Sequence, residues 1–297
     1  LQLRVQGSRN AYTASNAYAI RPPREEVKKF LSLLPYSFTH HQRRATREIM
    51  HDMGKNVPMN RLLQGDVGSG KTVVSALALL NTARSGYQCA VMAPTEILAQ
   101  QHYTTLCKLF EPFDIRIALL TSQYQESTTA FCGVPPQAVG IKNQESRKTK
   151  KEICDSIRRG DTDIVIGTHT LIQEKVAFKH LAFVVIDEQH RFGVRQRKLL
   201  KEKNTDGTMP HLLSMTATPI PRSLALTAYG DLDISTIRQL PRGRKKIITK
   251  IVPREYREWT IDFITKQIHG GRQAFIVCPI IDESDTLGVK SVKEEYT

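Results

Sequence analysis

The stretch that decides the fold of this chain is Gly65-Asp66-Val67-Gly68-Ser69-Gly70-Lys71-Thr72. It fits G-x-x-x-x-G-K-[ST], the P-loop pattern that binds the phosphates of a nucleotide. The glycines let the backbone curl so that its N–H groups point at phosphate oxygens. Lys71 can then reach the β- and γ-phosphates, and the Thr72 hydroxyl can bind Mg²⁺. The loop therefore predicts an ATP–Mg²⁺ site made of all these residues; the alternative is a glycine turn that only caps a helix.

Apolar runs alternate with helical patterns on both sides of the P-loop. The expected strands are residues 61–63, 88–93, 115–120, 163–167, 183–186 and 211–214, and the expected helices include residues 73–84, 96–110 and 146–159. Strands that alternate with helices predict an α/β domain, with a mainly parallel sheet covered by helices on both faces. In such sheets the ligand binds at the carboxyl ends of the strands. The P-loop and the motifs below all follow an expected strand.

The composition divides the chain into three expected parts. Residues 1–34 are polar and basic, and Pro22-Pro23 breaks them, so we expect an arm or inter-domain connection. Residues 35–240 hold the α/β pattern, with a surface insertion expected at residues 121–145. The last part, residues 241–297, begins with a linker at residues 240–246. Beyond it the α/β pattern restarts with residues 247–252, a helix near residues 256–269, and residues 273–279.

Charge and cysteine content narrow the function classes. The net charge of +14, from 43 basic and 29 acidic residues, suits a polyanionic partner such as nucleic acid, although a soluble basic protein is the alternative. The five cysteines form no C-x-x-C pair, which supports neither a zinc site nor a disulfide framework and fits a reducing cytoplasm. The sequence contains no run of eighteen apolar residues, so it predicts no membrane-spanning helix. The chain starts with Leu1 and is expected to begin inside a longer protein.

Two adjacent carboxylates follow the expected strand at residues 183–186. P-loop enzymes hold Mg²⁺ with an acidic residue at such a strand end, and Asp187 suits that task. The neighbouring Glu188 can orient or deprotonate the attacking water. The alternative is a strand that ends in an exposed turn, where Asp and Glu are common.

The motif Asp187-Glu188-Gln189-His190 resembles motif II of the superfamily 2 helicases, in its D-E-x-H form. Other stretches follow in that family's order: residues 92–102 resemble motif Ia, residues 167–169 motif Ib, and residues 214–219 motif III. Gln42 resembles the upstream glutamine that senses adenine. The resemblance implies a RecA-like P-loop domain in which ATP lies between two lobes, the second of them incomplete here.

The same resemblance assigns roles to individual residues. The catalytic group would be Lys71, Asp187, Glu188, Gln189 and His190, the last two sensing the γ-phosphate. Coupling of that state to DNA would fall to Thr216, Ala217, Thr218 and Arg222, and contact with the DNA backbone to Pro94, Thr95, Glu96, Gly167, Thr168 and His169. Thr95 could instead be only a helix N-cap, and Arg222 only a surface arginine.

Three longer strings, residues 187–194, 215–222 and 228–233, are similar to the RecG family of bacterial DNA helicases. That resemblance implies remodelling of stalled forks and branch migration of Holliday junctions. It also implies ATP and Mg²⁺ as cofactors, branched DNA as partner, action as a monomer, and a cytoplasmic, nucleoid-associated location. The family's wedge domain and motifs V and VI are not found, so a fragment with poor turnover is expected. Alternatives are a transcription–repair coupling translocase, a primosome or restriction motor, or a binding module without catalysis.

Overall fold

The computed structural model describes residues 15–21, 23–121, 150–168, 171, 176–188, 199, 203–204, 207–218, 232–239 and 248–278. The expected linker at residues 240–246 and the expected insertion beyond Thr121 lie outside these residues. The chain divides into two compact units, Leu1–Arg244 and Lys245–Thr297, which are described separately.

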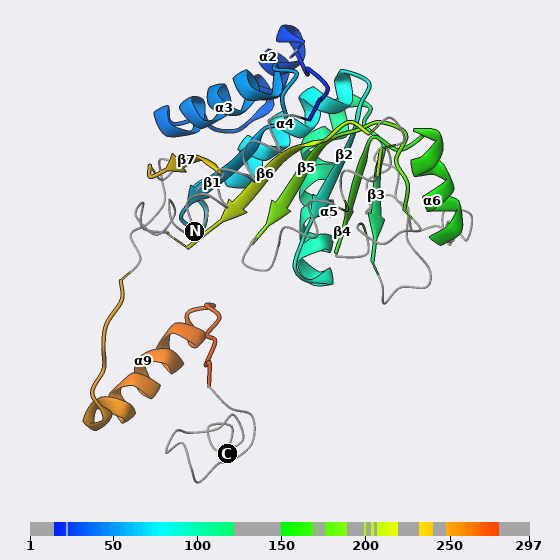
Figure 1. Cartoon of the computed structure of the whole chain (residues 1–297). Helices are drawn as coiled ribbons and strands as arrows, with labels where there is room; N and C mark the ends of the chain where they lie inside the picture. Colours follow the sequence, from blue (N-terminus) through cyan, green and yellow to red (C-terminus); the bar gives the residue numbers. More distant parts are fainter. Residues whose placement is uncertain are drawn as a thin grey trace, which may run out of the picture. The chain divides into compact units, whose positions relative to one another are not determined.

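The first unit alternates strands and helices as predicted (Figure 1). Its described strands are β1 (Asn60–Gly65), β2 (Gln88–Met92), β3 (Ile117–Leu120), β4 (Ile164–Gly167), β5 (Leu181–Asp187), β6 (His211–Thr216) and β7 (Asp233–Ile237). Its described helices are α2 (Arg24–Leu33), α3 (His40–Met53), α4 (Lys71–Arg84), α5 (Glu96–Phe110), the 3-10 turn η1 (Glu111–Phe113) and α6 (Lys150–Arg159). Every expected strand up to residue 214 is present, whereas α2, α3 and β7 were not predicted.

The seven strands form one sheet in the order β3-β4-β2-β5-β6-β1-β7, and every pair is parallel. The predicted parallel α/β fold is therefore confirmed. Because all strands run the same way, their carboxyl ends lie at one edge of the sheet. Apart from β7 at one end of the sheet, the strands are almost continuously buried, as expected for a parallel sheet covered on both faces.

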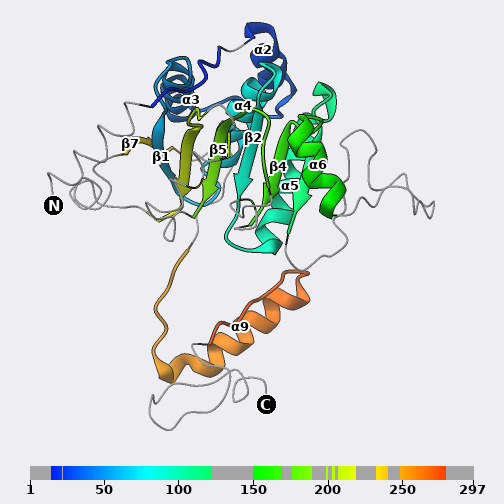
Figure 2. The ribbon, with the colours of Figure 1, turned by 45° about the vertical axis from the view of Figure 1, so that its right-hand side comes forward.

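Alternate strand residues feed two separate cores, one on each face of the sheet. Val91 of β2 belongs to a core that includes apolar residues of α2, α3, α4 and α5. Its neighbours Ala90 and Met92 belong to the other core, which α6 covers with Ile153 and Ile157. These helices can be followed in Figures 1 and 2. None of the described helices is long and apolar enough to cross a membrane.

The segment before residue 35 was expected to be an arm or inter-domain connection, and its described residues contribute to the core of the first unit. Phe30 of α2 is buried between Phe110 and Phe113, at centroid distances of 6.2 and 6.0 Å. The backbone N–H of Ile20 donates to the carbonyl of Met53 at 2.8 Å. Because this segment is mostly polar, its sequence did not predict that a few apolar residues anchor it to the first unit.

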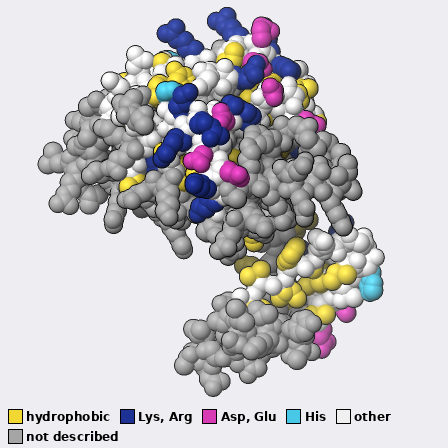
Figure 3. Space-filling model, turned by 90° about the vertical axis from the view of Figure 1, so that its right-hand side faces the viewer, with side chains coloured by type: hydrophobic (Ala, Val, Ile, Leu, Met, Phe, Trp, Pro, Cys, Tyr) yellow, Lys and Arg dark blue, Asp and Glu magenta, His cyan; other side chains and the backbone are white. Residues whose placement is uncertain are grey.

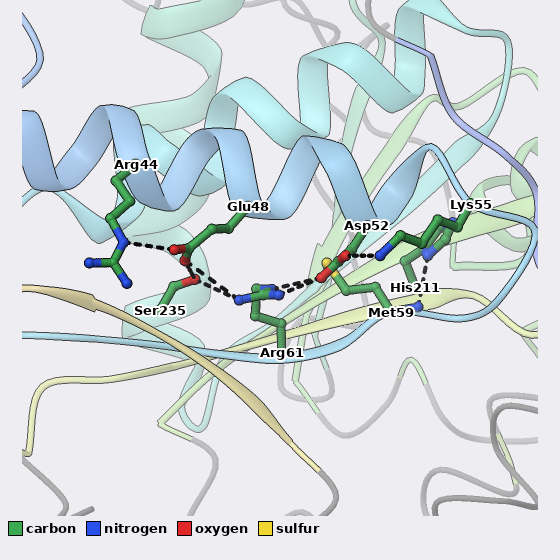
Figure 4. A network of polar contacts seen from close by, with 8 residues as sticks. All are labelled: Arg44, Glu48, Asp52, Lys55, Met59, Arg61, His211 and Ser235. Carbon is green, nitrogen blue, oxygen red and sulfur yellow. Dashed lines mark hydrogen bonds and ion pairs between the residues drawn. The ribbon is translucent and has the colours of Figure 1, made fainter.

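Helix α3 begins with a capping box and is fastened to the sheet by ion pairs (Figure 4). Arg61 of β1 lies between Glu48 and Asp52 of α3, and its Nη1 donates to Ser235 Oγ of β7 at 2.9 Å. Burial alone would raise the pKa of Asp52, but hydrogen bonds from Lys55 and Arg61 and their charges outweigh it and lower the pKa. The network joins α3 and β1, which are neighbours in sequence, to β7, which is far from both.

His211 is a buried histidine in the same region of the first unit. The backbone N–H of Met59 donates to His211 Nδ1 at 2.9 Å, so Nε2 carries the hydrogen and donates to the carbonyl of Tyr18 at 2.7 Å. Burial lowers the pKa of His211, although the bond to Tyr18 and the charge of Asp52 oppose this.

The described part of the second unit contains η5 (Arg254–Tyr256) and α9 (Arg257–His269). The helix expected near residues 256–269 is confirmed, but the strands expected at residues 247–252 and 273–279 are wrong for their described residues, 248–252 and 273–278. A strand needs a hydrogen-bonded neighbour, and none is present among the described residues of this unit. Their apolar side chains are exposed as a result, and Figure 3 shows yellow side chains on this unit's surface.

Candidate nucleotide site

Three neighbouring strands bring the predicted site residues to one edge of the sheet. The P-loop follows β1, Asp187 ends β5, and Thr216 ends β6, which lies between them. In the register, Gln64 pairs with Thr216, and Asp187 pairs with Met215. Residues more than one hundred positions apart in sequence therefore meet at the strand ends.

The P-loop adopts a conformation that depends on its glycines. Gly68 and Gly70 have φ angles of 74° and 91°, a region that favours glycine. A side chain at Gly65 would place its Cβ 2.5 Å from Ser69 Oγ and 3.0 Å from the carbonyl oxygen of Ile237. The carbonyl of Asp66 accepts from the Ser69 N–H at 3.0 Å. Glycine is thus required at these positions for the loop to close.

The loop ends where α4 begins, and this geometry fits a bound phosphate. The first N–H groups of a helix have no partner inside it, and the helix dipole favours an anion there. Ser69 Oγ is buried and has no hydrogen-bond partner among the described residues. Asp66, Val67 and Gly68 are exposed at the mouth of the loop. A buried hydroxyl without a partner at the N-terminus of a helix is what a phosphate group would satisfy.

Lys71 is half-buried and points back into the loop. Its Nζ donates to the carbonyl of Gly65 at 2.7 Å and to that of Asp66 at 3.2 Å. Burial lowers the pKa of the Lys71 ammonium, while the charges of Asp187, Glu188 and Asp66 oppose the shift. Lys71 is therefore close enough to both predicted catalytic carboxylates to interact with them electrostatically.

Asp187 has a partner that the sequence did not reveal. His102 of α5 lies with its Nε2 2.7 Å from Asp187 Oδ2, and both side chains are largely buried. His102 falls in the stretch that resembles motif Ia, but a histidine seven residues beyond a helix cap carries no signal that it faces a carboxylate on another strand. The proximity arises because α5 packs on the sheet beside the strand ends.

Glu188 occupies a strained backbone position and links two motifs. Its φ of 50° is uncommon for a residue with a side chain. Its carboxylate accepts from the N–H of Ala217 at 3.1 Å, and its own N–H donates to the carbonyl of Met215 at 3.0 Å. Next to this contact, the Thr216 and Thr218 hydroxyls are 2.9 Å apart. The acidic pair is thus tied directly to the stretch that resembles motif III.

Gln42 is completely buried and connects α3 to the P-loop. Its Oε1 accepts from the N–H of Thr39 at 2.8 Å, and its Nε2 donates to the carbonyl of Ser69 at 2.8 Å. A Cβ on Gly70 would lie 2.2 Å from Gln42 Nε2. The amide predicted to recognise adenine therefore also caps a helix and braces the phosphate loop.

The described residues among the predicted DNA contacts lie at the ends of two further neighbouring strands, β2 and β4; they are Pro94, Thr95, Glu96, Gly167 and Thr168. Thr95 is the N-cap of α5, its Oγ1 accepting from the N–H of Leu98 at 3.3 Å, as the alternative anticipated. Pro94 is exposed at the same turn. A Cβ on Gly167 would lie 2.2 Å from the carbonyl oxygen of Leu120, so packing alone requires a glycine there. The remaining predicted residues, Gln189, His190, His169 and Arg222, lie outside the described part.

Basic and acidic side chains lie next to one another on one side of the first unit. Figure 3, which views the side where α6 and β3 lie in Figure 1, shows Lys and Arg side chains beside Asp and Glu. Ion pairs in this region join Arg116 to Asp163 and Arg159 to Asp161, each at 2.7 Å. Paired charges of this kind attract a polyanion only weakly. We therefore do not expect nucleic acid to bind on this side.

The sequence matches the model of a protein family, "DEAD/DEAH box helicase", over residues 39–227. Among curated proteins, the ATP-dependent DNA helicase RecG of Bacillus subtilis is 45% identical over 99% of this chain, which spans 40% of that protein. RecG of Thermotoga maritima is 47% identical over 91% of the chain and 32% of its own length. The chain therefore corresponds to less than half of these relatives.

Solved structures agree with the fold. A structure of RecG bound to a three-way DNA junction matches with a TM-score of 0.77 and 41% identity, covering 95% of this chain and 35% of that one. The helicase MrfA bound to DNA matches with a TM-score of 0.54 at 19% identity, over 84% of this chain and 36% of that one, which supports the fold alone.

Proposed function

This chain belongs to the DEAD/DEAH box helicase family, and on that premise we propose that it is the ATP-binding lobe of a RecG-type DNA helicase, with the start of a second lobe. The observation that carries the proposal is the convergence of the P-loop, Asp187 and Glu188 at one sheet edge. In the whole protein, ATP hydrolysis would drive the remodelling of stalled forks and the branch migration of Holliday junctions.

Each predicted residue of the site is assigned one task. The P-loop N–H groups and Lys71 hold the phosphates, and Thr72 and Asp187 hold Mg²⁺. Bound Mg²⁺ neutralises charge that develops on the transferred phosphoryl group. Glu188 orients the attacking water. Gln189 and His190 sense the γ-phosphate, and Gln42 recognises adenine while it braces the loop through Ser69.

The contact between Glu188 and Ala217 supports a route from the nucleotide to DNA. A change at the γ-phosphate that moves Glu188 would be felt by the Ala217 N–H, 3.1 Å from its carboxylate. Thr216, Thr218 and Arg222 would pass this movement on. Pro94, Thr95, Glu96, Gly167, Thr168 and His169 would contact the DNA backbone at the neighbouring strand ends.

DNA, in branched form for the whole protein, is the proposed partner, and the protein is proposed to act as a monomer in the bacterial cytoplasm at the nucleoid. The residues proposed to contact the DNA backbone would bind phosphates rather than bases, so the affinity for DNA should arise from counterion release. With about three to five phosphate contacts on single strands, log K should fall with log salt at a slope of about −2 to −4.

Fluorescence anisotropy on single-stranded, duplex and forked oligonucleotides, each over a range of salt concentrations, tests this. We expect the stated slope, little dependence on base sequence, and binding that responds to ATP–Mg²⁺. Binding that is independent of salt, or strong selection of one base sequence, would contradict a lobe that tracks the DNA backbone. It would favour a sequence-specific binding module.

A further inference from the structure

We propose that His102 is a positioning residue that holds the Asp187 carboxylate in the orientation needed for Mg²⁺. The inference rests on the proposed function, because it assigns Asp187 to the metal. His102 itself would contact neither the nucleotide nor the metal. Its role would be to fix the carboxylate that does.

The contact is specific in its atoms. A carboxylate only accepts hydrogen bonds, so the 2.7 Å contact makes His102 Nε2 the donor and Asp187 Oδ2 the acceptor. The side chains of His102 and Asp187 are 12% and 15% exposed, so water competes little for the bond. With Oδ2 engaged by the imidazole, Oδ1 is the oxygen best placed to serve a metal.

The elements that carry the pair are fixed independently. Asp187 ends β5, which lies between β2 and β6 in the sheet. Helix α5 is anchored by its Thr95 cap and by buried Ala99, Leu106 and Phe110. Neither partner needs this hydrogen bond to hold its backbone in place. The bond therefore sets the rotamer of Asp187 rather than the fold around it.

Hydrogen bonds to metal-binding carboxylates and histidines commonly determine affinity, and their loss costs about 10- to 100-fold in metal affinity or activity. Loss of the His102 donor leaves the Asp187 side chain free to rotate. Ordering the carboxylate would then reduce the free energy of Mg²⁺ binding. The P-loop contacts to phosphate do not involve His102. The effect should therefore be confined to Mg²⁺-dependent binding.

Three substitutions separate positioning from packing. His102→Gln carries an amide nitrogen near the place of Nε2 and should preserve the bond. His102→Asn has an equally polar but shorter side chain that does not reach Oδ2, and His102→Leu removes the donor while keeping bulk. Thr105→Leu, at an exposed site on the same helix, is the matched control.

Binding of a fluorescent ATP analogue to the whole 297-residue chain, with Mg²⁺ and with EDTA, provides the measurement. Circular dichroism checks that each variant is folded. We expect His102→Asn and His102→Leu to lose about tenfold of the enhancement by Mg²⁺. Affinity in EDTA should be unchanged, and His102→Gln and Thr105→Leu should resemble the parent.

Several outcomes would overturn the inference. An unchanged Mg²⁺ enhancement in all variants would show that the bond does not matter, and a stronger enhancement would mean that His102 competes with the metal. An equal loss in Mg²⁺ and EDTA would indicate packing, as would failure of both His102→Asn and His102→Gln to fold. A parent chain that binds no nucleotide in either buffer would instead contradict the proposed function.

Discussion

Strand β5 and residues 273–278 have similarly apolar sequences, but β5 is buried in a sheet and residues 273–278 are exposed. Phe183, Val184 and Val185 are completely buried in the centre of a parallel sheet. Phe275 and Val277, in the stretch Gln-Ala-Phe-Ile-Val-Cys, are 87% and 91% exposed and form no strand. The comparison shows that β-forming residues specify a strand only where neighbours supply hydrogen bonds and a covered face.

The largest expected effect comes from placing the same substitution in both stretches. Val185→Asp would bury a carboxylate without a partner and should destabilise the first unit by more than about 4 kcal/mol. Val277→Asp should change stability by less than about 0.5 kcal/mol, because exposed sites tolerate charge. Urea unfolding followed by circular dichroism measures both. Similar losses for the two variants would remove the distinction between the stretches.

A smaller effect is expected at the ion-pair network of the first unit. Arg61→Met leaves Glu48 and Asp52 without their central cation, and breaking a pair buried to this extent costs about 3 kcal/mol. Arg44→Met is the control, because Arg44 is an exposed partner of Glu48 on the same helix and is worth about 0.5 kcal/mol. Equal urea midpoints for the two variants would show that the network does not fasten α3.

The buried side chain of His211 predicts that the unfolding free energy of the first unit depends on pH. Burial places the pKa of His211 below its ordinary value of 6.5, so below about pH 6.5 the unfolded chain binds a proton that the folded chain does not. Stability is fully present above that pH and falls as pH decreases, by at most about 1.4 kcal/mol per pH unit.

His211→Gln should remove this contribution to the slope of unfolding free energy against pH. His51→Gln, at an exposed histidine of α3, is the matched control and should keep the parent slope. A slope that survives in His211→Gln would assign the pH dependence to other groups.

The smallest effect is expected in the second unit. Trp259 and Phe263 stack on α9 at a centroid distance of 5.8 Å, although both are about half exposed. Phe263→Ala should lower the stability of α9 by about 0.2–0.5 kcal/mol and leave the first unit unchanged. Because the chain has one tryptophan, Trp259 fluorescence reports this unit selectively. A change in the urea midpoint of the first unit would show that the two units are coupled.

The sequence predicted much of the first unit because its signals are strong and local. The P-loop fixed the connection between β1 and α4, and apolar runs located the strands. β7 was missed because Asp233-Ile-Ser-Thr-Ile is short and polar. Helix α3 was missed because only Ala45, Ile49 and Met53 mark its buried face among charged residues. The strands predicted in the second unit failed because pairing is not a local property.

The candidate site was predicted less completely for a related reason. Motif spacing identified Lys71 and the acidic pair, whose place at strand ends follows from the parallel topology. The contact of His102 with Asp187, and that of Glu188 with Ala217, depend on packing between elements far apart in sequence. Gln42 both caps α3 and contacts the P-loop, and this also depends on how α3 lies against the P-loop.

The central claim is that the P-loop edge of the first unit binds ATP–Mg²⁺, and titration of the whole chain with a fluorescent ATP analogue tests it most directly. Lys71→Ala removes the ammonium beside the phosphates, and loss of a charge-assisted contact worth about 1.5–3 kcal/mol should weaken binding about 10- to 100-fold. Lys108→Ala removes the same charge from an exposed site on α5 and should bind like the parent. Equal affinity for the parent and Lys71→Ala would contradict the claim.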